Sequence, residues 1–349
     1  MDVLRVLNPT LYSNAMSLPA LGVFAYLYRS QRFGSFARLN LLTQLSVFIP
    51  MVQIPALLTG RLSYVDLAWP SGLLAMGFLG LVRALRRIFL HSNNKDGSKN
   101  KPVGFTAGNV RAVVVSLAYC FQGGRMALGA WTMFFAGHLR KEMQRYRYQR
   151  IRWAAHGIVE GSLAEKIEVQ KEAFTQCLAN LGPLSVPMAL QSCVDPGPMT
   201  LADAVGWALW AASFVFEHTA DLQKLAFGLN MKRQGLRKQV CNVGLWRHSR
   251  HPNYFGEWMV WVALAIASLP ALQKLVGTDK EGKQESTVSR VCAILSLLSV
   301  PTSMYICLVH WTGAIPAEHY SVKSRPAYAD YIKQVNRFFP SLGLLVKRQ

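Results

Sequence analysis

The sequence predicts an all-α membrane protein, a multi-pass bundle of about seven or eight transmembrane helices. Hydrophobic residues make up 51% of the 349 residues. Apolar stretches of about 20 residues, the length that crosses a bilayer as a helix, recur along the whole chain. The net charge of +20 is concentrated in blocks between these stretches, as expected of loops that face lipid head groups.

The transmembrane prediction rests on apolar segments that are separated by polar or basic connections. Proline pairs interrupt two of them, at Pro50 and Pro55 and at Pro183 and Pro187, which neighbouring helices can accommodate in a bundle. A polar connection is expected at 91–102. The predicted segments cover residues 11–28, 39–59, 67–90, 108–138, 171–191, 201–222, 252–275 and 288–312.

Composition also excludes some classes of protein. The basic residues carry no zinc-finger, RNP-type or basic-zipper pattern, so we expect no nucleic-acid partner. The six cysteines include no C-x-x-C pair and lie in or beside apolar segments, which indicates buried thiols. The first 30 residues show no cleavable signal pattern, so an internal helix is expected to direct membrane insertion.

The distribution of Lys and Arg predicts a topology. With the N-terminus in the cytosol and alternating crossings, the loops at 140–171 and 224–250 and the C-terminal tail lie on the cytosolic side and carry most of the basic charge. Three polar clusters that are remote in sequence then face the same side, which predicts a site there.

The first cluster lies at the end of the sixth segment. Glu217, Asp221 and Lys224 are spaced i, i+4 and i+7, so they share one stripe of a helix. Carboxylates at the end of an apolar helix are costly unless they face a cavity or a partner. The alternative is an interfacial salt-bridge ladder.

The second cluster opens the seventh segment, in the stretch GLWRHSRHPNYFGEWMVW. Pro252 suits the first turn of a helix, so the helix is predicted to begin at His251 or Pro252. Arg247 and Arg250 precede a helix N-terminus, which favours anions, and arginines there are a candidate phosphate clamp. The alternative is anchoring of the helix by arginines and tryptophans at the membrane surface.

Anchoring does not account for the polar residues that follow. Asn253 and Glu257 are not needed for it, and Tyr254 and Glu257 fall on one side of the predicted helix. His248 and His251 are spaced H-x-x-H without a carboxylate or cysteine at ligand spacing, so no metal site is predicted.

The third cluster is in the tail. Glu318 ends the eighth segment, and an acid beside a basic pocket can bind a ribose or a polar head group. Tyr328 and Tyr331 lie i, i+3 on a short amphipathic helix, which could alternatively rest on the cytosolic leaflet.

With these clusters in place, the chain resembles the steroid 5-alpha-reductase-like membrane proteins, in the branch whose reaction is not settled. The motifs of the resemblance are YVDLAWPSG from Tyr64, RYRYQRIRW, EHTADLQKLAF, GLWRHSRHPNYFGEW and YADYIKQVNRFFP, in that order. The R-H-P-x-Y-x-G pattern is shared with membrane sterol reductases and with isoprenylcysteine and phospholipid methyltransferases. In all of these the C-terminal half holds a cofactor near the cytosolic face.

For the reductases the resemblance implies NADPH, a substrate-side region over residues 1–138 and a cofactor-binding domain over 139–349. The residues that match the cofactor cradle are Asp221, Lys224, Arg247, Arg250, His251, Asn253, Tyr254, Glu257, Tyr328 and Tyr331. Glu217 and Glu318 join them as candidates from the clusters above.

The chain departs from the steroid enzymes where those place a glutamate that polarises the substrate carbonyl. The matching run here is VQIP, so Gln53 stands in its place and can donate a hydrogen bond without acting as an acid. Tyr64 and Asp66 are local candidates for the missing catalytic group. The alternative for both is a surface turn.

The expected function is NADPH-dependent reduction of a carbon–carbon double bond in an apolar lipid or sterol-like substrate, in the endoplasmic reticulum membrane. An S-adenosylmethionine-dependent lipid or prenyl-cysteine methyltransferase on the same scaffold is the first alternative. A non-catalytic membrane scaffold is the second, because Gln53 replaces the catalytic glutamate.

Overall fold

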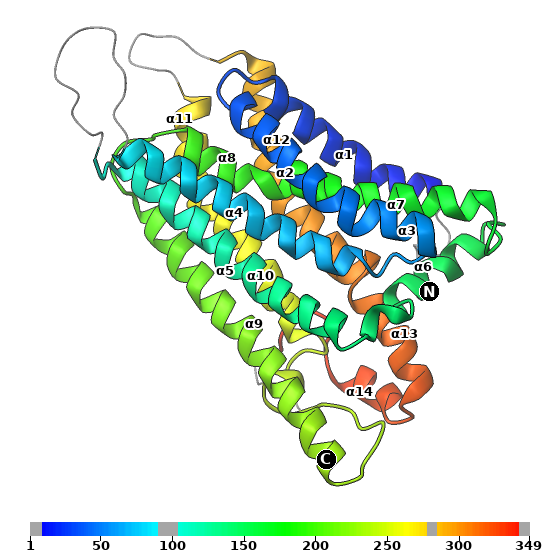
Figure 1. Ribbon diagram of the computed structural model, residues 1–349. Coiled ribbons are helices and arrows are strands. Elements are labelled where there is room, and N and C mark those ends of the chain that lie inside the picture. Colours follow the sequence, from blue (N-terminus) through cyan, green and yellow to red (C-terminus); the bar gives the residue numbers. More distant parts are fainter. Residues whose placement is uncertain (1–8, 90–103, 278–284, 342–349) are drawn as a thin grey trace, which may run out of the picture. The chain divides into compact units, whose positions relative to one another are not determined.

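A computed structural model describes residues 9–89, 104–277 and 285–341, and every regular element in these ranges is a helix (Figure 1). The polar connection expected at 91–102 lies outside the described residues. In chain order the helices are α1 (Pro9–Arg29), α2 (Gly34–Phe48), η2 (Ile49–Gln53), α3 (Ile54–Thr59), α4 (Val65–Phe89), α5 (Ala107–Phe135), η3 (His138–Arg140), α6 (Gln144–Ala154), α7 (Leu163–Leu181), η4 (Pro183–Ser185), α8 (Val186–Cys193), α9 (Leu201–Arg233), η5 (Gly244–Arg247), α10 (Pro252–Ala267), α11 (Leu269–Val276), α12 (Thr287–Tyr305), η6 (Ile306–Trp311), α13 (Ala314–Ser324) and α14 (Tyr328–Gln334).

All eight predicted apolar segments are helical. The prolines mark changes of helix type: Pro50 lies in the π-helix η2, which joins α2 to α3, and Pro183 opens the 3₁₀ turn η4 between α7 and α8. The fourth segment is one helix, α5, whose first turn is capped by the Thr106 side chain, which accepts a hydrogen bond from the Asn109 N–H.

Among the described residues, three helical stretches are long and apolar enough to cross a membrane: Gly34–Thr59, Val65–Phe89 and Thr287–Ser324. A fourth is α10 with α11, which bend by 41° at their junction, if the pair forms one span. This supports a membrane protein of three or four spans and does not confirm the predicted seven or eight. Helix α7 is one of the helices that are not among these spans. Its first turns carry five charged side chains, which are costly in a bilayer: Glu165, Lys166, Glu168, Lys171 and Glu172.

Helix α9 is longer than the sequence predicted. It continues past the apolar segment at 201–222 to Arg233, for 33 residues in all. The added turns, LQKLAFGLNMKR, consist mainly of residues with high helix propensity, so the backbone remains helical after the apolar pattern ends. This extension provides one wall of the cavity described below.

The chain forms two compact units. Unit 1 comprises Met1–Val205 and Leu264–Val300, and unit 2 comprises Gly206–Ala263 and Pro301–Gln349. The limits of these two units differ from the predicted boundary, which separates residues 1–138 from residues 139–349. The roles predicted for those two regions stay predictions.

In unit 1, α4 and α5 run side by side (Figure 1), and small residues bring their backbones together. A Cβ atom on Gly77 would lie 2.7 Å from the Cys120 backbone nitrogen, and one on Gly123 would lie 2.5 Å from the Leu74 backbone nitrogen. Only glycine fits at either position, so this helix pair depends on both.

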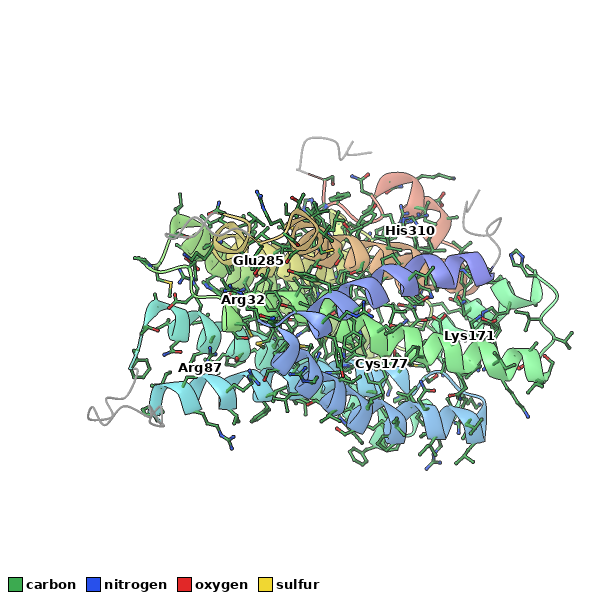
Figure 2. The ribbon with its side chains drawn as sticks, turned by 90° about the horizontal axis from the view of Figure 1, so that it is seen from above. Arg32, Arg87, Lys171, Cys177, Glu285 and His310 are labelled. Carbon is green, nitrogen blue, oxygen red and sulfur yellow. The ribbon has the colours of Figure 1, made fainter. Side chains whose placement is uncertain are left out.

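A buried polar network joins α2, α4 and α7 in the same unit. The Asn180 side-chain amide donates to Gln44 Oε1 and to the Trp69 carbonyl, at 3.1 Å each, and Gln44 donates to the Gly72 carbonyl at 3.0 Å. Cys177, labelled in Figure 2, lies one turn before Asn180 on α7 and is buried in the apolar core of unit 1. These bonds fix the register of the three helices.

In unit 2, α9 and α10 cross at Gly256. A Cβ atom on this residue would lie 2.9 Å from the Glu217 backbone nitrogen. The C-terminal segment is fastened to the turn before α10: the Arg250 N–H donates to the Asn336 carbonyl at 2.8 Å, and the Ser249 hydroxyl donates to the Phe338 carbonyl at 2.8 Å. Both contacts hold the start of α10 in place.

Candidate functional site

Unit 2 contains a cavity of about 620 Å³. It lies among the end of α9, the segment 234–243, the start of α10 and the helices α13 and α14. Among the described residues that line it, none is Asp or Glu. Its cationic side chains are Lys224, Lys232, Arg237, Lys238, Arg250 and Arg325.

The turn before α10 places Arg250 in the cavity wall. Its Nε donates to Glu318 Oε1 at 2.7 Å, and its Nη1 donates to the carbonyls of Ile332 and Val335. Arg337 Nε donates to the other Glu318 oxygen at 3.1 Å. Arg250 is therefore a buried, neutralised arginine that ties α10 to α13 and to the end of α14.

His251 completes this cluster. Its Nε2 lies 3.3 Å from Glu318 Oε1, and its ring stacks on Tyr254 with centroids 5.2 Å apart and planes 5° from parallel. Burial lowers the pKa of His251, and the hydrogen bond to Glu318 only partly opposes this effect. The imidazole is therefore neutral at pH 7. With Nε2–H donated to Glu318, Nδ1 is the acceptor.

Lys224 lines the cavity from α9. Its ammonium lies 4.0 Å from the centroid of the Trp246 ring, a cation–π contact, and the Trp246 indole N–H donates to the Ala220 carbonyl at 2.9 Å. Lys224 is exposed over part of its surface. Protein surrounds the side chain elsewhere, and this burial lowers its pKa.

Asn253, in the first turn of α10, also lines the cavity. Its side-chain amide donates to Asp221 Oδ1 at 3.0 Å. Its own oxygen is buried without a hydrogen-bond partner among the described residues. An amide oxygen in this state at a cavity wall can accept a hydrogen bond from a ligand.

Two tyrosines of α14 close the site. The Tyr331 hydroxyl donates to the Trp246 carbonyl, and burial raises its pKa well above the ordinary value. Burial also raises the pKa of Tyr328 to about 12. Both phenols are therefore protonated at neutral pH, and Tyr331 holds α14 against η5.

The structure brings most of the predicted cofactor residues together in unit 2. Those that line the cavity are Lys224, Arg250, His251, Asn253, Tyr254, Tyr328 and Tyr331. Asp221 and Glu318 do not line it but hold Asn253, Arg250 and His251 in position.

Three predicted residues lie elsewhere. Arg247 is exposed and does not line the cavity, and its Nε donates to the Asn242 carbonyl at 3.1 Å. Its part in a phosphate clamp stays a prediction. Glu217 and Glu257 are buried where α9 and α10 cross, and neither lines the cavity. The sequence placed the start of α10 correctly, but it did not show which side chains face the open space.

The sequence analysis missed several residues of the cavity. Residues 235–241 line it continuously, and Arg325 follows α13. Lys238 has φ 61°, the only positive φ of a non-glycine residue in the described ranges, so the segment is sharply turned there. The run KRQGLRK at 232–238 is the sequence signal for this segment, but its charge fits a loop that faces lipid head groups equally well.

The predicted catalytic residues belong to unit 1. Asp66 accepts a hydrogen bond from the Tyr146 hydroxyl at 2.7 Å and lies 3.6 Å from Arg145, and Tyr64 packs under Arg61. These contacts stabilise the turn between α3 and α4. Gln53 lies in η2, and its backbone carbonyl accepts a hydrogen bond from Gln170 at 3.3 Å.

A second cavity, of about 460 Å³, lies at this end of unit 1, and none of the three predicted catalytic residues lines it. Its wall contains Glu142 and Glu165, which both pair with Arg150. Glu142 also accepts the backbone N–H groups of Leu62 and Ser63 at 3.0 Å each. Glu142 and Glu165 therefore form hydrogen bonds and ion pairs within unit 1.

The described chain is thus an all-helical protein with three or four apolar helices that could cross a membrane, and with a basic cavity in one unit. Residues 105–278, just under half of the chain, match the model of a family described as "Protein of unknown function (DUF1295)". No curated protein and no solved structure matches the chain. The matched region contains Lys224, Arg250 and His251 and ends before α13 and α14.

Proposed function

We propose that unit 2 binds NADPH and that the protein is a membrane oxidoreductase, which reduces a carbon–carbon double bond of a lipid or sterol-like substrate. The observation that supports this most is the cavity with six cationic side chains and no lining carboxylate. A ligand with several phosphate groups complements such a cavity, because each phosphate is attracted by every nearby cation. A volume of about 620 Å³ lies in the range of cofactor sites.

The cavity also offers groups that suit the uncharged parts of a dinucleotide. Trp246, Tyr254 and Tyr328 line it with aromatic rings, which suit contact with planar bases. The buried Asn253 oxygen and the His251 Nδ1 supply acceptors for hydroxyl or amide hydrogens. When bound, NADPH supplies a hydride. A protein group or water would then deliver a proton to the neighbouring substrate carbon.

Charge separates this proposal from the methyltransferase alternative. S-adenosylmethionine carries a sulfonium and an ammonium group against a single carboxylate, so it is a net cation. The cations that line the cavity repel such a ligand and attract the phosphates of NADPH. A non-catalytic scaffold does not by itself account for a cavity of this charge.

A thermal-shift experiment on the purified full-length protein in detergent tests the proposal. A ligand at 100 times its dissociation constant stabilises the folded state by about 2.7 kcal/mol. We expect NADPH to raise the unfolding temperature, and S-adenosylmethionine to leave it unchanged. A shift with S-adenosylmethionine alone would support the methyltransferase, and no shift with either ligand would support the scaffold.

A further inference from the structure

The cations of the cavity in unit 2 differ in how far they are already neutralised. Arg250 pairs with Glu318 and with two backbone carbonyls, so little of its charge remains for a ligand. Lys232, Arg237 and Lys238 are exposed to solvent, which screens them. Lys224 and Arg325 remain. Lys224 is exposed over part of its surface, but its ammonium packs on the Trp246 ring, and Arg325 is half-buried.

Arg325 and Lys224 face the same space from different elements. Arg325 Nη1 donates to the Ser321 hydroxyl at 3.0 Å, which directs the guanidinium along the end of α13. Lys224 extends from α9 over Trp246. The two groups are close enough for the charge of Arg325 to disfavour protonation of Lys224.

The neighbours of Lys224 compensate its charge only weakly. Asp221, on its own helix, already accepts a hydrogen bond from Asn253. Cys241, from the segment 234–243, is a thiol whose pKa burial raises, so it stays neutral. His251, at the start of α10, is neutral as well. Two cations that line one cavity, where no described lining residue is a carboxylate, together attract an anion.

We infer that Lys224 and Arg325 form the anion-binding centre of the cavity and that this centre takes a phosphate group. Under the proposed function the phosphate belongs to NADPH, so to that extent the inference rests on that proposal. The same chemistry would accept the phosphate of an anionic lipid head group. Arg325 is thus assigned a direct binding role that the sequence analysis did not give it.

The inference has a consequence for pH. Lys224 loses its proton more readily than an ordinary lysine because burial and Arg325 disfavour its charge. A phosphate bound between the two groups favours the charged form. Binding is therefore coupled to proton uptake on the alkaline side, and affinity falls as the pH rises through the pKa of Lys224 in the free protein. An arginine at position 224 would not titrate in this range.

The test uses the full-length protein in detergent and inorganic pyrophosphate as the probe, measured by isothermal titration calorimetry. We expect Arg325→Gln to weaken binding by about tenfold or more, since it removes one charged hydrogen-bonding partner. Arg325→Lys should retain part of the affinity. Lys323→Gln removes an equal charge from an exposed position of α13 outside the cavity and is the matched control.

The pH arm compares the wild type with Lys224→Arg. The wild type should lose affinity from pH 7 to pH 10, whereas Lys224→Arg should lose much less. Equal effects of Arg325→Gln and Lys323→Gln, or identical pH profiles of wild type and Lys224→Arg, would overturn the inference.

Two further ligands separate the inference from the proposed function. If NADPH binds and Arg325→Gln has no effect, the phosphate centre is wrong and the proposed function stands. Alternatively, phosphatidic acid in the micelles stabilises the wild type but not Arg325→Gln, and NADPH stabilises neither. The phosphate centre then stands, and the phosphate that it binds belongs to a lipid.

Discussion

At the scale of single residues, unit 2 separates side chains that face the cavity from side chains that hold them there. Glu318 illustrates the second group: one carboxylate positions Arg250, His251 and Arg337 and does not line the cavity. The sequence analysis placed Glu318 beside a basic pocket, which is where it lies. Its contacts are with protein cations, whereas we had expected it to bind a ribose or a polar head group.

Asp221 likewise holds a lining residue in position, because it accepts a hydrogen bond from the Asn253 amide. In Asp221→Ala the Asn253 amide loses its hydrogen-bond partner and is free to turn away from the cavity. We expect NADPH to bind about tenfold more weakly, the equivalent of one lost hydrogen bond to a charged group, as measured by titration calorimetry. Asp330→Ala, an exposed carboxylate of α14 outside the cavity, is the control and should bind as the wild type does.

The buried His251 predicts a dependence of stability on pH. Its pKa in the folded state is lowered from 6.5, so below pH 6.5 the unfolded chain takes up a proton that the folded chain resists. The free energy of unfolding therefore falls as the pH drops below 6.5, by at most about 1.4 kcal/mol per pH unit from this residue.

Thermal unfolding of wild type and His251→Gln between pH 7.5 and pH 5 measures this effect. The difference in unfolding temperature between the two proteins should change over this interval, in the sense that the wild type loses more stability. Parallel curves would show that His251 is charged, or accessible, in the folded protein.

At the scale of the elements, the crossing of α9 and α10 determines where the cavity walls stand. Gly256→Ala places a methyl group 2.9 Å from the Glu217 backbone nitrogen, so the helices must separate. Overpacking of this kind costs about 1–3 kcal/mol, and the unfolding temperature should fall. Gly228→Ala, in α9 with open space around the added methyl, should leave the unfolding temperature unchanged or raise it.

The element that sequence patterns predicted least well is the end of α9 with the segment 234–243. Apolar periodicity ends near residue 222, but the helix continues to Arg233 because its residues favour the helical backbone. Segment 234–243 has no periodicity, so its place in the cavity wall follows only from the packing around it. The basic run at 232–238 was visible, yet charge alone does not distinguish a loop that faces a membrane from one that lines a cavity.

At the scale of the whole molecule, the chain forms two units, and the basic cavity lies wholly in unit 2. Ligand binding should therefore slow amide hydrogen exchange in the segments of unit 2 that form the cavity: residues 224–254 and 314–335. The polar network of unit 1 around Asn180 serves as the internal reference. Protection of 40–180 by NADPH with none in 224–254 would place the ligand in unit 1 and refute the assigned site.

The sequence by itself determined that the described chain is helical and where its apolar segments lie, because these follow from local periodicity and propensity. It also located the three clusters at 217–224, 247–257 and 318–331. The tertiary structure decided which members of each cluster face the cavity. Lys224 and Asn253 line the cavity, whereas Asp221 and Glu318 hold lining residues in position. The sequence does not show this difference, because the burial of a side chain depends on the elements that pack against its helix.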